Sequence, residues 1–264
     1  MLLRTIFLAA TLAGYLSAGY LPAATHSDDE QSINWKMITI TKALPGCQAK
    51  PSLLKCASVQ LTYPTILSAP SATGKAEINR QLEDMLLTPI EKGKPPATAD
   101  EFASQILNHY RVWLKHGGSA KIPWDVQRKI DVVYQSANVF AVKLFESVEQ
   151  GTQHPAQNTV YFNFRPDSGH LVQLTDLIAA DDMDKFAAVI NKHLKKRAKK
   201  SPEGEDTKEP GQEFELPKNF SIERDGLRFR YEEGQVNPES DTVPEFLVRY
   251  SEIKKMLRPD AKVP

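Results

Sequence analysis

The sequence has little cysteine, no excess of charge of either sign and no repeated segment. Only two of its 264 residues are cysteines, too few for a multi-disulfide scaffold or a four-cysteine metal centre. Its 33 basic residues equal its 33 acidic ones, which argues against nucleic-acid binding. No internal repeat or long low-complexity tract occurs, so we expect neither a solenoid nor a disordered chain.

Long apolar runs are also scarce, and the one present lies at the start of the chain. Arg4 precedes an apolar run from Thr5 to Ala18 that is rich in Ala and Leu, the layout of a secretory signal peptide. We therefore assign residues 1–24 to a signal peptide and expect a periplasmic or secreted protein. An uncleaved anchor is the alternative, because the 20 residues of 5–24 just suffice to cross a bilayer.

The mature chain would be nearly neutral. Removing residues 1–24 leaves 32 basic against 33 acidic residues, a net charge of −1. We therefore expect no nucleic-acid partner, and no stable membrane span if the signal is cleaved.

The two cysteines, Cys47 and Cys56, are expected to form a structural disulfide. An even pair in an exported chain is most simply a disulfide, here closing the loop CQAKPSLLKC. A redox or metal pair would need closer spacing or further ligands, and no histidine lies between Ser27 and Asn108. We predict neither a metal nor a cofactor.

Apolar periodicity divides the first half of the chain into strands and amphipathic helices. Two consecutive helices must share a surface to cover, and the natural cover is a sheet. We predict an α+β fold, with helices packed on a mostly antiparallel sheet, in two adjacent or intertwined subdomains over residues 34–148 and 149–258. The expected strands are 34–42, 57–63, 124–134 and 139–148, and the expected helices are 77–90 and a segment from a capping box at Thr98 to Gly117.

The stretch GTQHPAQNTVYFNFRPDSGHLVQLTDLI joins a His-Pro loop, a tight turn and a helix start. The turn at Pro166–Gly169 predicts a hairpin with arms at residues 160–164 and 171–174. Thr175 or Asp176 can cap the helix that follows. None of these features requires catalysis.

The rest of the chain is expected to hold one further helix and a closing set of strands. The helix over 181–200 begins with acidic residues and ends with basic ones, as the helix dipole favours. The basic run KHLKKRAKK could instead attract lipid head groups or wall polymers. The acidic stretch 201–213 contains Pro and Gly and is expected to be a mobile loop. Strands over 220–223, 227–231 and 246–250 and a helix over 251–257 follow.

Several short motifs resemble the RsiV/PdaC-like extracytoplasmic domain. This family occurs in RsiV-type lysozyme-sensing anti-sigma factors, in some peptidoglycan deacetylases and in envelope proteins of unknown function. The resemblance covers roughly residues 35–257 and implies an α+β fold and a binding role. The motifs are Tyr63-Pro64, Ile78-Asn79, Gly151, His154-Pro155, Asn163-Phe164, Gly169, the segment LTDL at 174–177, and the closing segments FSIERDGLRFRYEEG and VPEFLVRYSEIKKML.

The chain departs from these relatives in three places. Only four residues precede the apolar run, so we expect no cytoplasmic tail able to hold a sigma factor. Nothing follows Pro264, so we expect no deacetylase domain. The segment Glu232-Glu233-Gly234 after Tyr231 replaces a longer turn of the family, which puts the local binding surface in doubt.

His154 is the residue most open to a catalytic role, because a loop histidine can act as a base when a carboxylate orients it. Asp167, His170 and Asp176 are near it in sequence. No nucleophile accompanies it, and a zinc site with His170 would need a third ligand at no recognisable spacing. A His154-Pro155 pair that shapes a turn is the simpler interpretation.

Two other groups were weighed as a reacting or stacking site. Glu232 and Glu233 would face opposite sides of a strand and could not flank one glycosidic bond. Trp124, near a loop, is the aromatic residue best placed for ligand contact, whereas Trp113 falls on an apolar helix stripe. The candidate binding residues are Gln153, His154, Pro155 and Trp124, and no catalytic residue is assigned.

These features favour a non-enzymatic, exported envelope protein. The resemblance implies a lysozyme-like protein or the peptidoglycan of the cell wall as its partner. The alternatives are a wall-modifying enzyme with an unrecognised site and an accessory subunit of an envelope complex.

Overall fold

The structure is a computed structural model that describes residues 33–47, 56–90, 94–119, 121–151, 155–198, 215–236 and 243–264. The predicted signal peptide and the predicted loop 201–213 lie outside these residues. No helix in the described ranges is long and apolar enough to cross a membrane.

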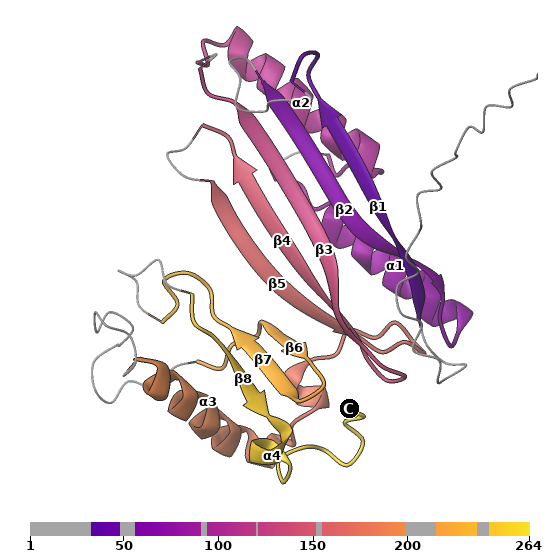
Figure 1. Ribbon diagram of the computed structural model, residues 1–264, viewed down its shortest axis with the longest axis vertical. Helices are drawn as coiled ribbons and strands as arrows, with labels where there is room; N and C mark the ends of the chain where they lie inside the picture. Colours follow the sequence, from indigo (N-terminus) through magenta and orange to yellow (C-terminus); the bar gives the residue numbers. More distant parts are fainter. Residues whose placement is uncertain are drawn as a thin grey trace, which may run out of the picture. The chain divides into compact units, whose positions relative to one another are not determined.

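A five-stranded sheet with two helices behind it forms the first part of the fold (Figure 1). Its strands lie side by side in chain order, and every neighbouring pair is antiparallel except β2 and β3. The two helices form the connection between this parallel pair, which a short turn could not bridge. The elements are β1 (Asn34–Ala43), β2 (Ala57–Ser68), α1 (Ala72–Leu86), α2 (Ala99–Lys115), β3 (Trp124–Gln135), β4 (Phe140–Glu149) and β5 (Ala156–Phe164).

Side-chain caps set where the two helices begin. Thr98 Oγ1 accepts the N–H of Glu101 at 3.1 Å, which confirms Thr98 as the cap. The Glu101 carboxylate accepts the N–H of Ala97 at 2.8 Å, one residue before the cap, so the reciprocal bond of the predicted capping box is not formed. Ser71 caps α1 in the same way, so that α1 begins earlier than the apolar pattern indicated. Its Oγ accepts the N–H of Gly74 at 2.8 Å.

Strand β2 is longer than predicted. We expected it to stop before Pro64, but it continues to Ser68. Pairing with β3 ends at Thr62, so Pro64 pairs only with Met37 of β1. A proline is tolerated in a strand where one side has no neighbour, because its missing N–H leaves no bond unmade there.

The helix-facing side of the sheet holds the first core, and the predicted disulfide closes one corner of it. Cys47 and Cys56 are bonded and both are buried, which confirms the pairing. Leu44, just before the loop, is bonded through its N–H to the carbonyl of Ala57. The core is formed mainly by Val59, Leu61, Ile78, Leu82, Phe102, Ile106, Tyr110, Val126, Ile130 and Phe140.

A three-stranded antiparallel sheet with its own helices forms the second part. The strands are β6 (Phe220–Ile222), β7 (Gly226–Arg230) and β8 (Glu245–Arg249), and the helices are α3 (Met183–Ala198) and α4 (Tyr250–Ile253). The predicted Asp-Gly turn is present, and a Cβ at Gly226 would come within 2.1 Å of the Val248 carbonyl oxygen. The second core includes Phe186, Ile190, Leu194, Leu227, Phe229, Tyr231 and Val248.

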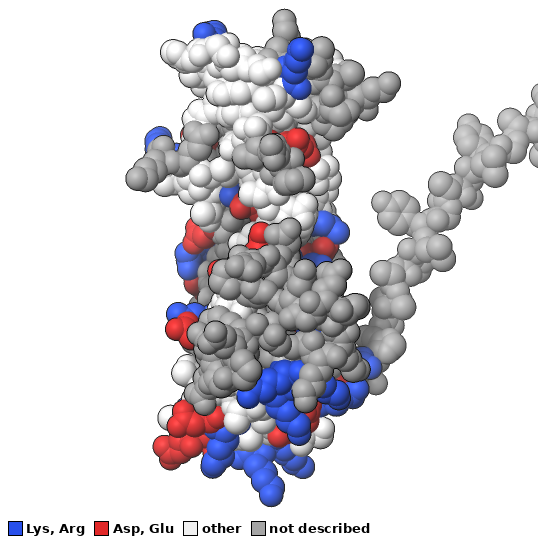
Figure 2. All heavy atoms as spheres, turned by 90° about the vertical axis from the view of Figure 1, so that its left-hand side faces the viewer, with Lys and Arg blue, Asp and Glu red and all other residues white. Residues whose placement is uncertain are grey.

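Charges of both signs share the surface around α3. The helix begins with Asp184 and ends with Lys195, Lys196 and Arg197, the order that the helix dipole favours. In Figure 2, basic side chains gather at the lower end of the molecule, where Figure 1 shows α3, and acidic side chains lie beside them.

The fold class is confirmed as α+β with mostly antiparallel sheets, and the two parts interlock. Strand β5 follows the division at residue 148 that the sequence suggested, yet it is the edge strand of the first sheet, paired with β4. Conversely, Val139 and Ala141, at the start of β4, belong to the second core. Each part therefore depends on residues of the other.

Two asparagine side chains join the sheets where β5 meets β6. The amide of Asn163, on β5, donates to the carbonyl of Phe220 at 2.9 Å and accepts the N–H of Ile222 at 2.7 Å. The amide of Asn219 accepts the N–H of Tyr161 at 2.8 Å and donates to the carbonyl of Thr159 at 2.7 Å. Each side chain replaces the two backbone hydrogen bonds that a strand neighbour would supply. We call these four bonds the amide junction.

A half-buried charge network lies beside the amide junction. The Tyr161 hydroxyl contacts Glu245 Oε1 at 3.4 Å, and Glu245 Oε2 pairs with Arg230 at 3.0 Å. Arg228 binds Glu223 and lies 3.6 Å from Glu245. Burial, and to a smaller extent Glu245, raises the pKa of Tyr161 to about 12. Tyr161 is thus linked to the second part of the fold twice, through its N–H to Asn219 and through its hydroxyl to Glu245.

We expect Asn163→Ala to destabilise the protein by about 2–4 kcal/mol, because it leaves a buried N–H and a buried carbonyl unpaired. Asn163 is 1% exposed, so water cannot replace the lost amide. Urea unfolding followed by circular dichroism measures the change. Gln157→Ala, at an exposed position of the same strand, is the control and should shift stability by less than about 0.5 kcal/mol. Equal stabilities for the two variants would contradict the role given to Asn163.

Candidate functional site

The turn after β5 is tighter than the predicted hairpin. The N–H of Arg165 bonds to the carbonyl of His170 at 2.9 Å, and the N–H of Gly169 bonds to the carbonyl of Arg165 at 2.7 Å. The first predicted arm is part of β5, but the second is reduced to one bridge, Leu171 to Phe164. The expectation of a paired strand over 171–174 was wrong, because a 3₁₀ helix (Leu174–Asp176) begins there.

This turn packs directly on the start of α1. Gly169 has φ +73°, and a Cβ there would lie 2.5 Å from Cβ of Glu77. A Cβ at Gly74 would lie 2.2 Å from the carbonyl oxygen of Pro166. Gln81 donates to the carbonyl of Gly169 at 2.8 Å. Glycine at both contacts is what allows the two backbones to approach.

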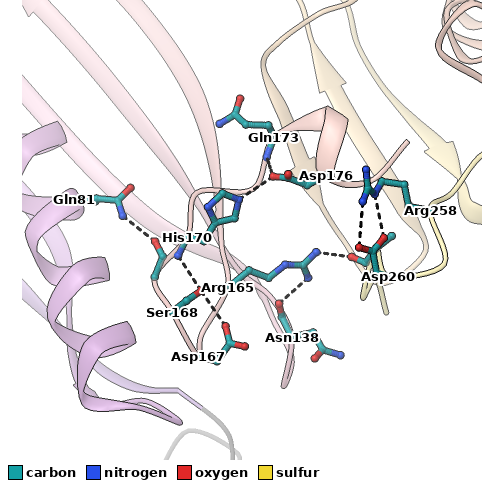
Figure 3. Close-up of polar contacts among 12 residues, drawn as sticks. Gln81, Asn138, Arg165, Asp167, Ser168, His170, Gln173, Asp176, Arg258 and Asp260 are labelled. Atoms are coloured by element: carbon teal, nitrogen blue, oxygen red, sulfur yellow. Dashed lines mark hydrogen bonds and ion pairs between the residues drawn. The ribbon is translucent and has the colours of Figure 1, made fainter. Parts of the chain in front are cut away.

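An open, polar cavity of about 370 Å³ lies beside the turn (Figure 3). We call it the polar hollow. It brings the turn together with the C-terminal segment, two parts of the chain far apart in sequence. It is lined by Arg165, Asp167, Ser168, His170, Asp176, Arg258, Asp260 and Lys262.

Arg165 ties three segments together at one wall of the hollow. Its guanidinium donates to the carbonyls of Asn138 at 3.1 Å and Lys262 at 2.9 Å, and also to that of Ala261. Burial lowers the pKa of Arg165, and the neighbouring carboxylates, Asp167 first, act against that shift. An arginine stays charged under such a shift, so it remains a strong donor to these carbonyls.

His170 and Asp176 form a pair across the hollow (Figure 3). His170 Nε2 lies 2.9 Å from Asp176 Oδ2, which also accepts the N–H of Gln173 at 2.8 Å. Burial alone would raise the pKa of Asp176, but the bonds from Gln173 and His170 outweigh it and lower the pKa. The N-cap residue of this 3₁₀ helix is Gln173, and Asp176 accepts its N–H from the third helical position. The prediction that Thr175 or Asp176 is the N-cap was therefore wrong.

The C-terminal segment supplies the opposite rim. Arg258 binds Asp260 through two nitrogens, Nε at 3.0 Å and Nη2 at 3.2 Å. The side-chain bond with Arg258 is the main cause that lowers the pKa of Asp260. Lys262 Nζ lies 4.0 Å from Asp167. Three fixed cations and three carboxylates thus line the hollow together with His170.

The hydroxyl nearest to His170 is not aligned for nucleophilic attack. Ser168 Oγ is bonded to Asp167 Oδ1 at 3.1 Å and accepts the N–H of His170 at 3.3 Å. A serine nucleophile needs its hydroxyl bonded to the imidazole that removes its proton. No group of three or more metal-binding side chains is found among the described residues.

Of the predicted binding residues, the two that the structure describes, Pro155 and Trp124, do not line this hollow. Gln153 and His154 lie outside the described residues, and Pro155 is exposed just before β5. Trp124 is only 5% exposed and packs between Tyr110 and Trp113, with ring centroids 5.4 and 5.5 Å away, so its indole is a core side chain.

Only part of the hollow could be recognised from the sequence. Asp167, His170 and Asp176 stood out as charged neighbours in one stretch. Arg258, Asp260 and Lys262 belong to no motif, and only the fold of the C-terminal segment brings them to the same place.

We expect Arg165→Ala to release the segment 258–264, because two carbonyls of that segment, those of Ala261 and Lys262, lose a charged donor. The predicted cost is about 2–3 kcal/mol, measured by urea unfolding, together with faster removal of the C-terminal residues by carboxypeptidase. Arg111→Ala, at an exposed position of α2, is the control. If both variants resist carboxypeptidase as the parent does, Arg165 does not anchor the segment.

Comparison with known proteins finds solved structures of similar fold and a family model that matches part of the chain. No curated protein matches the chain. A DUF3298 family protein from Pseudomonas aeruginosa matches with a TM-score of 0.64 and 14% identity, over 88% of this chain and 97% of that one. A DUF3298 member from Bacteroides fragilis matches with a TM-score of 0.66 and 15% identity, over 86% and 94%. At these identities, the similarity shows the fold alone. Residues 175–251 match the model of the family described as "Protein of unknown function (DUF3298)".

Proposed function

We propose that this chain is an exported cell-envelope protein that acts by binding, and that its polar hollow takes a zwitterionic segment of peptidoglycan, the stem peptide. The observation that carries the proposal is the balance of fixed charges around the hollow, three cationic and three anionic side chains. The resemblance to wall-associated envelope proteins supports the same partner class.

The charge balance selects the kind of ligand. A ligand with charge of one sign is repelled by half of the charged side chains that line the hollow. A ligand with both an ammonium and a carboxylate can pair with the side chains of both signs. Stem peptides of the wall carry both groups. Arg258 and Asp260 are on the exposed rim, so their side chains can exchange part of their mutual bonding for bonds to such a ligand.

The proposed location follows from the signal peptide predicted over residues 1–24. The bonded pair Cys47 and Cys56 is compatible with it, because disulfides persist in oxidising compartments such as the periplasm. We therefore place the protein in the periplasm or outside the cell.

The decisive experiment measures binding of a soluble muropeptide by calorimetry and retention on purified sacculi. We expect Arg258→Gln and Asp260→Asn each to weaken muropeptide binding about tenfold, the value of one charge-assisted bond. Both residues are exposed, so the variants should fold normally. Arg80→Gln removes another exposed, carboxylate-paired arginine, on α1, and should bind as the parent does.

Four outcomes would contradict the proposal. Absence of retention on sacculi, or unchanged affinity in both rim variants, would remove the hollow as the binding site. Retention on immobilised lysozyme but not on sacculi would identify a protein partner instead. Release of soluble fragments from sacculi would show a wall-modifying enzyme.

A further inference from the structure

Two charged side chains of the polar hollow are left open to a ligand, because the others already have partners. The engaged groups are Arg165 with three backbone carbonyls, Arg258 with Asp260, and Asp176 with His170 and Gln173. Within the described part of the chain, the Lys262 ammonium makes no hydrogen bond, and the Asp167 carboxylate accepts only the Ser168 hydroxyl. We call Asp167 and Lys262 the open pair.

The open pair is a cation and an anion that lie side by side without a close bond. Lys262 Nζ lies 4.0 Å from Asp167 Oδ2, beyond the roughly 2.7–2.9 Å of a charge-assisted hydrogen bond. Both side chains are exposed, at 58% and 62%, so a ligand can reach them from water. Each group can therefore bind an ion of opposite sign without breaking a strong bond within the protein.

The main chain at both residues is attached to the rest of the fold. The carbonyl of Asp167 accepts the hydroxyl of Ser71, the residue that caps α1, and a Cβ at Gly74 would lie 3.0 Å from this carbonyl oxygen. The carbonyl of Lys262 accepts Nη1 of Arg165 at 2.9 Å. These contacts keep the two charges close to each other.

Lys262 also has a strained backbone. Its φ is +45°, and it is the only non-glycine residue with a positive φ in the part of the chain that the structure describes. This left-handed region is unfavourable for a residue with a Cβ, so glycine would be the more stable choice. Strain of this kind concentrates at functional sites, which points to a role for Lys262 other than stability.

The spacing of the open pair matches an α-amino acid. The ammonium nitrogen and a carboxylate oxygen of such a group are roughly 3 Å apart, because only two carbon atoms separate them. With a bond of about 2.8 Å at each end, these two atoms can bridge the 4.0 Å between Asp167 Oδ2 and Lys262 Nζ. The two ends of an extended dipeptide are about 6–7 Å apart and match this spacing less well.

The stem peptide of the wall can present such a group. Where its third residue is diaminopimelate and is not cross-linked, the side chain ends in an ammonium and a carboxylate on one carbon atom. We propose that the open pair binds this free amino-acid end, with the ammonium on Asp167 and the carboxylate on Lys262. This inference rests on the proposed function and names the part of the stem peptide that the polar hollow recognises.

The test is a nitrogen-15 NMR titration of the full protein with two muramyl tripeptides, one ending in meso-diaminopimelate and one in lysine. The lysine tripeptide keeps the side-chain ammonium but lacks the carboxylate beside it. We expect saturable shifts of the Asp167 and Lys262 amides, and about three- to tenfold tighter binding of the diaminopimelate tripeptide.

The outcomes separate this inference from the proposed function. Equal affinity for the two tripeptides would overturn the inference alone, because the hollow would still bind stem peptide. Binding of neither tripeptide would overturn both. Free meso-diaminopimelate that binds as tightly as its tripeptide would make the hollow a site for free amino acids and overturn the assignment to the wall.

Variants locate the two contacts. Lys262→Gln should bind both tripeptides alike, whereas Asp167→Asn should weaken both, since both carry the ammonium. Lys254→Gln, at an exposed position outside the hollow, is the control and should keep the preference of the parent. A Lys262→Gln protein that still prefers the diaminopimelate tripeptide would overturn the inference.

Lys262→Gly distinguishes a binding role from a structural one. It removes both the ammonium and the backbone strain, so we expect a melting temperature above that of the parent together with loss of the preference. A Lys262→Gly protein that keeps the preference would show that the carboxylate is bound elsewhere and would overturn the inference.

Discussion

The hydrogen bonds that two asparagine side chains make between β5 and β6 are the constraint on which the rest of the structure depends. Strand β5 is the edge of the first sheet, and an unpaired edge exposes backbone groups to other chains. Asn163 and Asn219 satisfy these groups and attach the second sheet at the same time. Because the turn at Pro166–Gly169 follows immediately, the junction also fixes where the polar hollow forms. Because side-chain amides take the place of strand pairing here, the contact between the two sheets depends on the residues at only these two positions.

Local sequence patterns predicted the helices and strands well, but they predicted the contacts between distant parts of the chain poorly. The helix cap at Thr98, the Asp-Gly turn before β7 and the disulfide depend on residues close in sequence, and all are present. Strand β2 ran past Pro64 because its neighbour on one side ends early, which no local pattern reveals. Trp124 looked like a loop aromatic, but two aromatic residues of α2 cover it. The rim of the hollow comes from residues 258–262, whose position depends on the whole fold.

Exposed and buried ion pairs are held differently in this fold. In the polar hollow, exposed pairs such as Arg258 and Asp260 are weakly coupled in water and can be shared with a charged ligand. At the C-terminal end of α1, the buried Arg128 pairs with Glu146 and donates to the carbonyls of Leu86 and Thr88. This buried cation closes the end of the helix, whose start packs against the turn beside the hollow.

Native-state hydrogen exchange tests the central claim most directly. The amides of Tyr161 and Ile222 donate to the two asparagine side chains. If the junction makes the two sheets one cooperative unit, both amides should exchange only by global unfolding, with the same free energy as the amide of Val142 in the middle of β4. Exchange of Ile222, together with the rest of β6 to β8, at a free energy several kcal/mol lower would show that the second sheet opens independently and would contradict the account.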